Sequence, residues 1–225
     1  MICSSGIVEF MTETSVPVAG PLSGRRAQAA RNDQVILESA RAVFVADPGA
    51  PISAVAVHAG VGISALYRRY ASKEELLRKL CSDGLAQYIA EAEAALADDR
   101  DPWESFSAFL HRLVDVEASS LTRRLAGTFT PTEELYRSAA RAQELNVQLF
   151  ERTAAAGVLR DDVVVDDLGL LLEQVTSLNV GDHERSNQLR HRYLTLFLDG
   201  LRSDSKSELP GPPPGWQELA ARWNA

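Results

Sequence analysis

Two short helical segments separated by a tight turn constrain this chain more than any other feature of its sequence. Residues 52–58 and about 63–70 each have the apolar spacing of a short helix. The four residues between them read Ala-Gly-Val-Gly. The alanine is small enough for the helices to cross closely, Gly60 can adopt the left-handed conformation that ends a helix, and Val61 can tuck beneath both. With Gly62 as an acceptable N-cap, the segment predicts a helix-turn-helix unit.

Helix start and stop signals run through the rest of the chain and predict an all-α fold. Capping boxes at Ser72–Glu75 and Thr130–Glu133, Asp101 before a proline, and Asp166 each indicate a helix start. The run Val163–Val165 is β-branched but too short and isolated to form a sheet. We expect helices over about residues 32–44, 52–58, 63–70, 73–96, 102–119, 131–156, 167–179 and 185–201, with a short one over 216–223.

The charge of the chain is distributed unevenly. The whole sequence has 23 basic and 31 acidic residues, a net charge of −8. Residues 21–80 carry nine basic against five acidic residues, a net charge of +4, which leaves −12 for the rest. A basic N-terminal region before an acidic body is typical of a chain that binds a polyanion at one end only.

Composition and local patterns also predict the domain organisation and compartment. We expect a tail over 1–27, a helix-turn-helix domain over 28–76, a larger helical domain over 77–203 and a proline-rich tail over 204–225. The N-terminus lacks the basic start and apolar core of a secretory signal, and no apolar run has the roughly 20 residues that span a bilayer. Its two cysteines do not indicate a disulfide framework. These features predict a cytoplasmic protein with no membrane partner.

Signatures of catalysis and metal binding are missing from the sequence. The four histidines are scattered, and no His-x-x-x-His, Cys-x-x-Cys or Glu-x-x-His pair offers metal-ligand spacing. No Gly-x-Ser-x-Gly or phosphate-binding glycine loop occurs. The acidic pairs 161–162 and 166–167 flank a predicted helix start, where carboxylates serve as caps. We therefore expect no enzyme activity, no metal and no cofactor.

The stretch ISAVAVHAGVGISALYRRYASKEELL resembles the DNA-binding signature of the TetR family of transcriptional regulators. The similarity extends upstream to ILESARAVF and covers about residues 31–80. Its most specific parts are 59–61, Leu66-Tyr67, an aromatic residue at Tyr70, and the run 72–76. The resemblance implies a homodimer that binds a near-palindromic double-stranded DNA operator, usually as a repressor. It also implies a variable C-terminal domain that binds a small-molecule effector and then releases the DNA.

The resemblance assigns DNA contacts to individual residues. Tyr67 and Lys73 match residues that contact phosphate, although a packed aromatic ring and a solvated cap are the alternatives. For Arg68, a bidentate contact with guanine and a contact with phosphate are equally expected. Arg69 is assigned to a phosphate contact. Pro51 and Gly62 depart from the family, which commonly has Ser or Thr there. The expected set is Ser53, Ile63, Ser64, Ala65, Tyr67, Arg68, Arg69 and Lys73, with Arg25 and Arg26 forming either a minor-groove arm or a solvated tail.

The last two long helices carry apolar residues on more than one face. Leu194 and Leu198 fall outside the main apolar stripe of the last helix, so this helix needs two burial partners. The family pairs its last two long helices with those of a second copy in a four-helix bundle, and the alternative is that both are internal core. The expected dimer residues are Leu168, Leu171, Leu172, Val175, Leu189, Tyr193, Leu196 and Phe197.

An apolar cavity with a few polar groups is what a small effector requires. Candidate lining residues are Trp103, Phe106, Phe109, His111, Phe129, Tyr136 and Gln174, for which plain core packing is the alternative. The run RYLTLFLDGLR and the proline-rich tail are similar to one actinobacterial subgroup of the family. A rival interpretation of the whole chain is a helical interaction protein that has kept the fold but lost operator binding.

Overall fold

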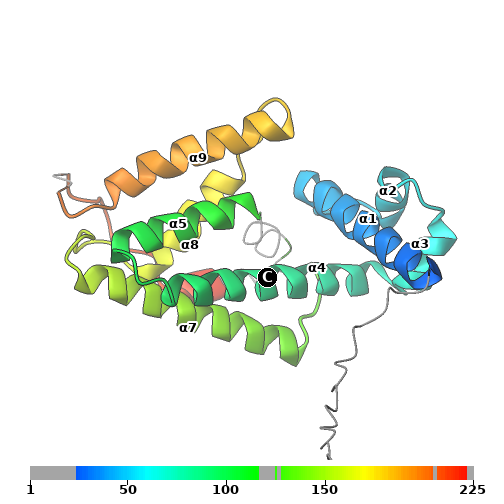
Figure 1. Cartoon of the computed structure of the whole chain (residues 1–225), viewed down its shortest axis with the longest axis horizontal. Coiled ribbons are helices and arrows are strands. Elements are labelled where there is room, and N and C mark those ends of the chain that lie inside the picture. Colours follow the sequence, from blue (N-terminus) through cyan, green and yellow to red (C-terminus); the bar gives the residue numbers. More distant parts are fainter. Residues whose placement is uncertain (1–23, 117–124, 126–127, 205–206, 222–225) are drawn as a thin grey trace, which may run out of the picture.

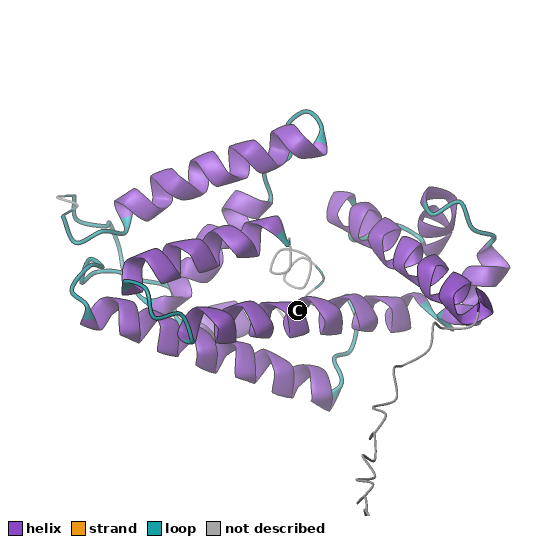
Figure 2. Cartoon of the chain, viewed as in Figure 1, coloured by secondary structure: helices purple, strands orange, loops and turns teal. Residues whose placement is uncertain are grey.

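The computed structural model describes residues 24–116, 125, 128–204 and 207–221 of the chain. The described residues form an all-helical structure, as the sequence predicts, in which β structure is limited to an isolated bridge between Leu159 and Arg202 (Figure 2). The helices are α1 (Gly24–Ala46), α2 (Ile52–His58), α3 (Ile63–Arg69), α4 (Lys73–Leu96), α5 (Pro102–Asp115), α7 (Glu133–Ala155), α8 (Val165–Thr176), α9 (His183–Gly200) and α10 (Trp216–Ala221).

The helices form two groups that share α4. Figure 1 shows α1, α2 and α3 gathered at one end of the molecule, while α4 runs from them into a bundle with α5, α7, α8 and α9. The N-terminal core consists of the buried apolar side chains of residues 36–81 together with Leu125 and Leu135. The C-terminal core consists of those of residues 88–114, 142–175 and 194–201. Leu85 of α4 packs against both cores, so this helix joins the two groups through continuous apolar contact.

The predicted bounds of α2 and α4 are confirmed, and α3 ends one residue before the predicted Tyr70. Both short helices are set by the turn: Gly60 has φ 65° and ends α2 in the left-handed conformation, and Gly62 is the N-cap of α3. Val61 is half-buried against the N-terminal core, as expected. The predicted domain boundary at residue 76 stays a prediction, although the N-terminal core continues to Cys81.

Several predicted helix starts are wrong by a few residues. Helix α1 begins at Gly24, inside the predicted tail, rather than at Asn32. Helix α7 is capped by Thr132 and not by Thr130, because the backbone of Thr130 is held by α4: its N–H donates to Glu74 and its carbonyl accepts from Arg78. Helix α9 begins at His183 after Asp182, two residues before the predicted start.

Helix α8 also differs from its prediction. It spans Val165–Thr176 rather than 167–179, so Asp166 lies inside the helix and is not its cap. The carboxylate of Asp167 accepts from the backbone N–H of Val164 at 2.9 Å, which satisfies the amide of the N-cap residue from within the first turn. Predicted elements over 1–23, 117–119 and 222–223 lie outside the described residues.

The turn at Gly60 generates a stability prediction. A Cβ at Gly60 would meet no atom within 4 Å, so Gly60→Ala costs only the left-handed backbone strain of about 1–2 kcal/mol. We expect a free energy of unfolding lower by about this amount in urea titrations. Gly62→Ser is the matched control, since Gly62 has φ −66° and serine is a good N-cap. An equal loss in both variants would contradict the assignment of strain to Gly60.

Candidate nucleic-acid interface

Helix α3 buries one face and exposes the other. Leu66 is fully buried in the N-terminal core and Tyr70, directly after the helix, is 2% exposed, so both are core residues. On the opposite face Ile63 and Tyr67 are 41% and 47% exposed. Ser64 and Arg68 are also exposed and Ala65 is half-buried, and Ser53 is exposed on α2. The structure therefore brings the predicted groove-facing residues of α3 together on one accessible surface.

The two arginines of α3 have different surroundings. Arg68 makes no hydrogen bond or ion pair with any residue that the structure describes. Arg69 instead donates two hydrogen bonds to Asp33 of α1, from Nε to Oδ1 at 2.7 Å and from Nη2 to Oδ2 at 2.9 Å. The Tyr70 hydroxyl donates to the same Oδ1 at 2.7 Å. Arg68 is thus available to a ligand, whereas Arg69 joins α3 to α1.

Asp33 is a residue of this site that the sequence analysis missed. The hydrogen bond from Arg69 is the largest influence on the Asp33 carboxyl and lowers its pKa. The pKa of the Tyr70 hydroxyl is raised, first by burial and then by its hydrogen bond to Asp33. Asp33 precedes the buried Ile36 by three residues and Ala40 by seven, so it continues the apolar stripe of α1. An acidic residue in such a stripe is the signal that points to a charged or hydrogen-bonding partner.

Lys73 lies at the start of α4, but its ammonium group faces the loop between α1 and α2. Its Nζ donates to the carbonyls of Pro48 at 3.2 Å and Ala50 at 2.7 Å, and lies 5.1 Å from the centroid of the Phe44 ring. A phosphate contact by Lys73 stays a prediction, and it requires the ammonium to leave or share these carbonyls. Beside it, Ser72 caps the Glu75 amide at 3.1 Å.

The seven candidate pocket residues are not brought around one site. Phe106 and Phe109 are buried in the C-terminal core, which fits the core-packing alternative for these two residues. The ring of His111 stacks on the ring of His191 of α9, with 5.0 Å between their centroids. The pKa of His111 is lowered, mainly because its ring is partly buried. Trp103 packs against the C-terminal core, with its ring centroid 6.2 Å from that of Phe106 and with Arg202 over its ring. The other three lie elsewhere: Phe129 packs on the N-terminal core, and Tyr136 and Gln174 are exposed.

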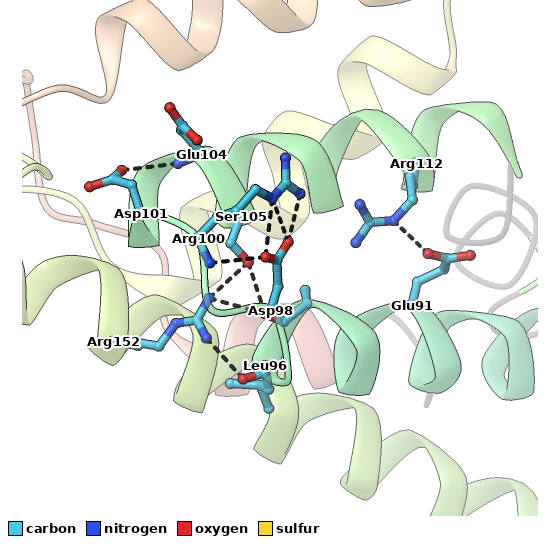
Figure 3. Close-up of polar contacts among 10 residues, drawn as sticks. Glu91, Leu96, Asp98, Arg100, Asp101, Glu104, Ser105, Arg112 and Arg152 are labelled. Atoms are coloured by element: carbon cyan, nitrogen blue, oxygen red, sulfur yellow. Dashed lines mark hydrogen bonds and ion pairs between the residues drawn. The ribbon is translucent and has the colours of Figure 1, made fainter.

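A polar cluster that the sequence analysis missed lies where α4 ends and α5 begins (Figure 3). The Arg152 guanidinium of α7 donates to the backbone carbonyls of Leu96 and Ala95 at 3.0 Å each and to Ser105 Oγ at 2.8 Å. These bonds satisfy carbonyls at the C-terminus of α4, where a cation is favoured. The cluster fixes α4, α5 and α7 to one another, and Ser105 within an apolar helix face is the signal for it.

The two helices predicted to form the dimer interface, α8 and α9, differ in how far their apolar side chains are exposed. Helix α9 buries Leu194 and Leu198 and exposes Tyr193, Leu196 and Phe197 by 42%, 57% and 40%, so its two apolar faces are confirmed. The remaining residues are placed as follows: Leu171 and Leu189 are half-buried, and Leu168, Leu172 and Val175 are buried in the C-terminal core. Their burial within one chain fits the internal-core alternative, and a place for these three residues in an interface stays a prediction.

Two family descriptions match this chain. "Bacterial regulatory proteins, tetR family" matches residues 36–80, and "Transcriptional regulator SbtR-like, C-terminal domain" matches residues 101–203. The chain belongs to the TetR family. This confirms the resemblance drawn from the sequence, and it identifies the chain as a TetR-family transcriptional regulator with a helix-turn-helix DNA-binding domain. The predicted actinobacterial subgroup stays a prediction.

Several solved protein structures resemble this regulator. The regulator SCO0520 from Streptomyces coelicolor is 25% identical, with a match that covers 77% of this chain and 99% of that one and a TM-score of 0.50. CprB from S. coelicolor A3(2) is 17% identical, with 87% and 98% coverage and a TM-score of 0.58. KstR2 of Mycobacterium tuberculosis is 20% identical, with 83% and 99% coverage and a TM-score of 0.55. A comparison with curated protein sequences found no match.

Two searches of the described residues bear on other classes of protein. Among residues 24–116, 125, 128–204 and 207–221, no group of three or more His, Cys, Asp or Glu side chains is arranged to hold a metal ion. Within the same ranges, no helix combines the length and the apolar character that crossing a membrane requires.

The position of Lys73 generates a second stability prediction. Lys73→Met keeps the apolar stem but removes the ammonium from two carbonyls, so we expect unfolding to require about 1 kcal/mol less in urea titrations. Lys79→Met is the matched control in the same helix, because its ammonium forms a partly exposed ion pair with Asp83, which is worth about 0.5 kcal/mol or less. Equal stabilities of the two variants would contradict a structural role for Lys73.

Proposed function

We propose that this chain is a ligand-responsive transcriptional repressor that binds a near-palindromic operator as a homodimer. The exposed face of α3 is the observation that carries the proposal, because it presents a tyrosine, a serine and an arginine with no partner among the described residues, all from a helix-turn-helix unit. The family uses this unit to bind DNA. A basic N-terminal region before an acidic body supports DNA binding at this end of the molecule.

The contacts divide into base reading and phosphate binding. We assign Arg68 to a bidentate guanine contact in the major groove, because its planar fork fits the O6 and N7 acceptors of guanine. Tyr67 and Lys73 are assigned to phosphates beside the groove, where they position the helix without reading sequence. The remaining assigned contacts come from Ser53, Ile63, Ser64 and Ala65. Arg25 and Arg26, for which the sequence predicts an arm or a tail, lie in the first turn of α1, and a DNA contact from their side chains stays a prediction.

The apolar stripe of α9 supports the dimer. Tyr193, Leu196 and Phe197 are exposed large apolar residues on one helix, and exposed apolar patches of this kind mark interaction surfaces. A two-fold axis beside α9 would pack α8 and α9 of one protomer against the same helices of the other in a four-helix bundle. The two α3 helices would then enter successive major grooves on one side of the DNA, about 34–36 Å apart.

Effector binding in the C-terminal group would act on DNA through α4. This helix contributes buried residues to both cores, so a change in its tilt moves the helix-turn-helix unit with it. An effector that prefers a different α3 separation lowers DNA affinity by linkage, with a coupling of about 1–3 kcal/mol.

A second candidate function is a helical interaction protein of the same fold that binds no specific operator. The specific observation in its favour is that two predicted cationic contacts are occupied inside the protein: Arg69 by Asp33, and Lys73 by backbone carbonyls. Gly62 also supplies no hydroxyl at the start of α3. Selection of DNA fragments by the purified protein distinguishes the two functions, because only the repressor would enrich a specific operator.

Operator selection with purified protein and genomic fragments tests the proposal. We expect enrichment of an inverted repeat at near-physiological salt, and Arg68→Ala should weaken binding to it by about 1–3 kcal/mol and relax the preference at one base pair per half-site. Tyr67→Phe should weaken binding to all sequences alike, since a phosphate carries no sequence information.

Arg137→Ala is the matched control for this experiment, because it removes an exposed arginine of α7 and should leave the selected repeat unchanged. If the folded dimer enriches no sequence, the interaction-protein function gains support. If a repeat is enriched but Arg68→Ala changes neither affinity nor base preference, the assignment of base reading to Arg68 is wrong.

The dimer surface is tested by a charge in its apolar stripe. Leu196→Glu should convert the dimer to a monomer in multi-angle light scattering, because an interface would have to bury an unpaired carboxylate. Gln188→Glu is the matched control, since this residue is exposed on α9 outside the stripe and should leave the mass unchanged. A dimeric Leu196→Glu protein would show that another surface holds the two copies together.

A further inference from the structure

We propose that Asp33 is a specificity-determining residue that withholds Arg69 from the DNA backbone and leaves Arg68 as the arginine of α3 available to the operator. The inference rests on the proposed function, since it concerns how this unit discriminates between operator and random DNA. It replaces the phosphate contact that the sequence predicts for Arg69 with an intramolecular role.

The geometry of the pair is that of a strong, specific interaction. Both oxygens of Asp33 accept from Arg69, at 2.7 Å and 2.9 Å, so the planar guanidinium meets the carboxylate in a two-point contact. The Tyr70 hydroxyl adds a third hydrogen bond to the carboxylate at 2.7 Å. The guanidinium carbon also lies 5.0 Å from the centroid of the Tyr70 ring, within cation–π range.

Partial burial makes this pair costly to separate. The side chain of Asp33 is 19% exposed and that of Arg69 is 52% exposed. If Arg69 moved to a phosphate, the Asp33 carboxylate would keep the hydrogen bond from Tyr70 and the attraction of the Lys79 charge, but it would lose its two-point partner. Because the Asp33 side chain is mostly buried, the loss of its paired counter-ion is unfavourable. Arg69 would exchange one anion for another and give up its contact with the Tyr70 ring. We therefore expect the pair to persist on DNA.

The consequence for DNA binding follows from how non-specific affinity arises. Each phosphate that a cationic side chain neutralises releases counterions and adds to the affinity for any sequence. Asp33 removes one such contribution in each protomer, while Arg68, one residue earlier and unpaired among the described residues, stays free to contact a base. A regulator must find its operator among many random sequences, so the occupancy of the operator depends on the ratio of operator affinity to random-DNA affinity. A lower affinity for random DNA raises this ratio.

Asp33→Asn in the full-length protein tests the inference. The variant should release Arg69, so binding to random duplex DNA should tighten, and the slope of log K against log salt concentration should steepen by about 0.9 per freed arginine, or about 1.8 per dimer. The ratio of operator to random affinity should fall. The double variant Asp33→Asn/Arg69→Ala should return the slope to that of the wild-type protein.

Glu38→Gln is the charge-matched control. Glu38 is an exposed acid of α1 whose carboxylate accepts from Gln34, so its loss changes the net charge equally without releasing Arg69. We expect no change of slope in this variant. A slope that steepens equally in Glu38→Gln and Asp33→Asn would reflect net charge alone and would overturn the inference.

Arg69→Ala decides the matter if Asp33→Asn does not fold, as judged by circular dichroism. If Asp33 holds Arg69 away from the DNA, Arg69 contributes no phosphate contact, and Arg69→Ala should keep the wild-type slope of log K against log salt concentration. A slope shallower by about 0.9 per protomer would overturn the inference. An unchanged slope in folded Asp33→Asn would overturn it as well. These results leave operator binding by the wild-type protein intact, whereas wild-type protein that binds no DNA would overturn the proposed function and this inference with it.

Discussion

The structure depends on α4 being buried at both of its ends against different partners. Leu76, Leu77 and Leu80 pack in the N-terminal core, and Tyr88 and Ala92 pack in the C-terminal core. A helix of 24 residues is about 36 Å long and curves only gently unless it is kinked, so its two ends cannot be oriented independently. The position of the helix-turn-helix unit is therefore set by how α4 lies in the bundle.

Both ends of α4 are also held by polar contacts from other parts of the chain. Lys73 binds carbonyls of the loop between α1 and α2, and Arg152 binds carbonyls of the last turn from α7. Between them, Glu74 and Arg78 hold the backbone of Thr130, ahead of α7. A displacement of α7 is thus transmitted to the first two turns of α4, close to the surface that would meet DNA.

Local signals allowed the helix-turn-helix unit to be predicted, whereas contacts between distant residues could not be. The turn at Gly60 and the cap at Ser72 act within a few residues, so the bounds of α2 and α4 followed from the sequence. The residues on the exposed face of α3 followed from the resemblance to the TetR family. The pairing of Arg69 with Asp33 joins residues 36 positions apart, and nothing in the immediate neighbourhood of either arginine of α3 distinguishes them. The apolar faces of α8 and α9 were similarly ambiguous until burial separated them.

The N-terminal core includes residues that come from far along the chain. Leu125 is fully buried there, Leu135 of α7 is 6% exposed, and Phe129 packs against the same core. The helix-turn-helix unit is therefore not a self-contained module that ends with α3. Chimeric regulators made by joining this unit to another effector domain at residue 76 would lose part of its hydrophobic core. A successful exchange has to carry the segment around 125–135, or a replacement with matching apolar side chains, along with the first turns of α4.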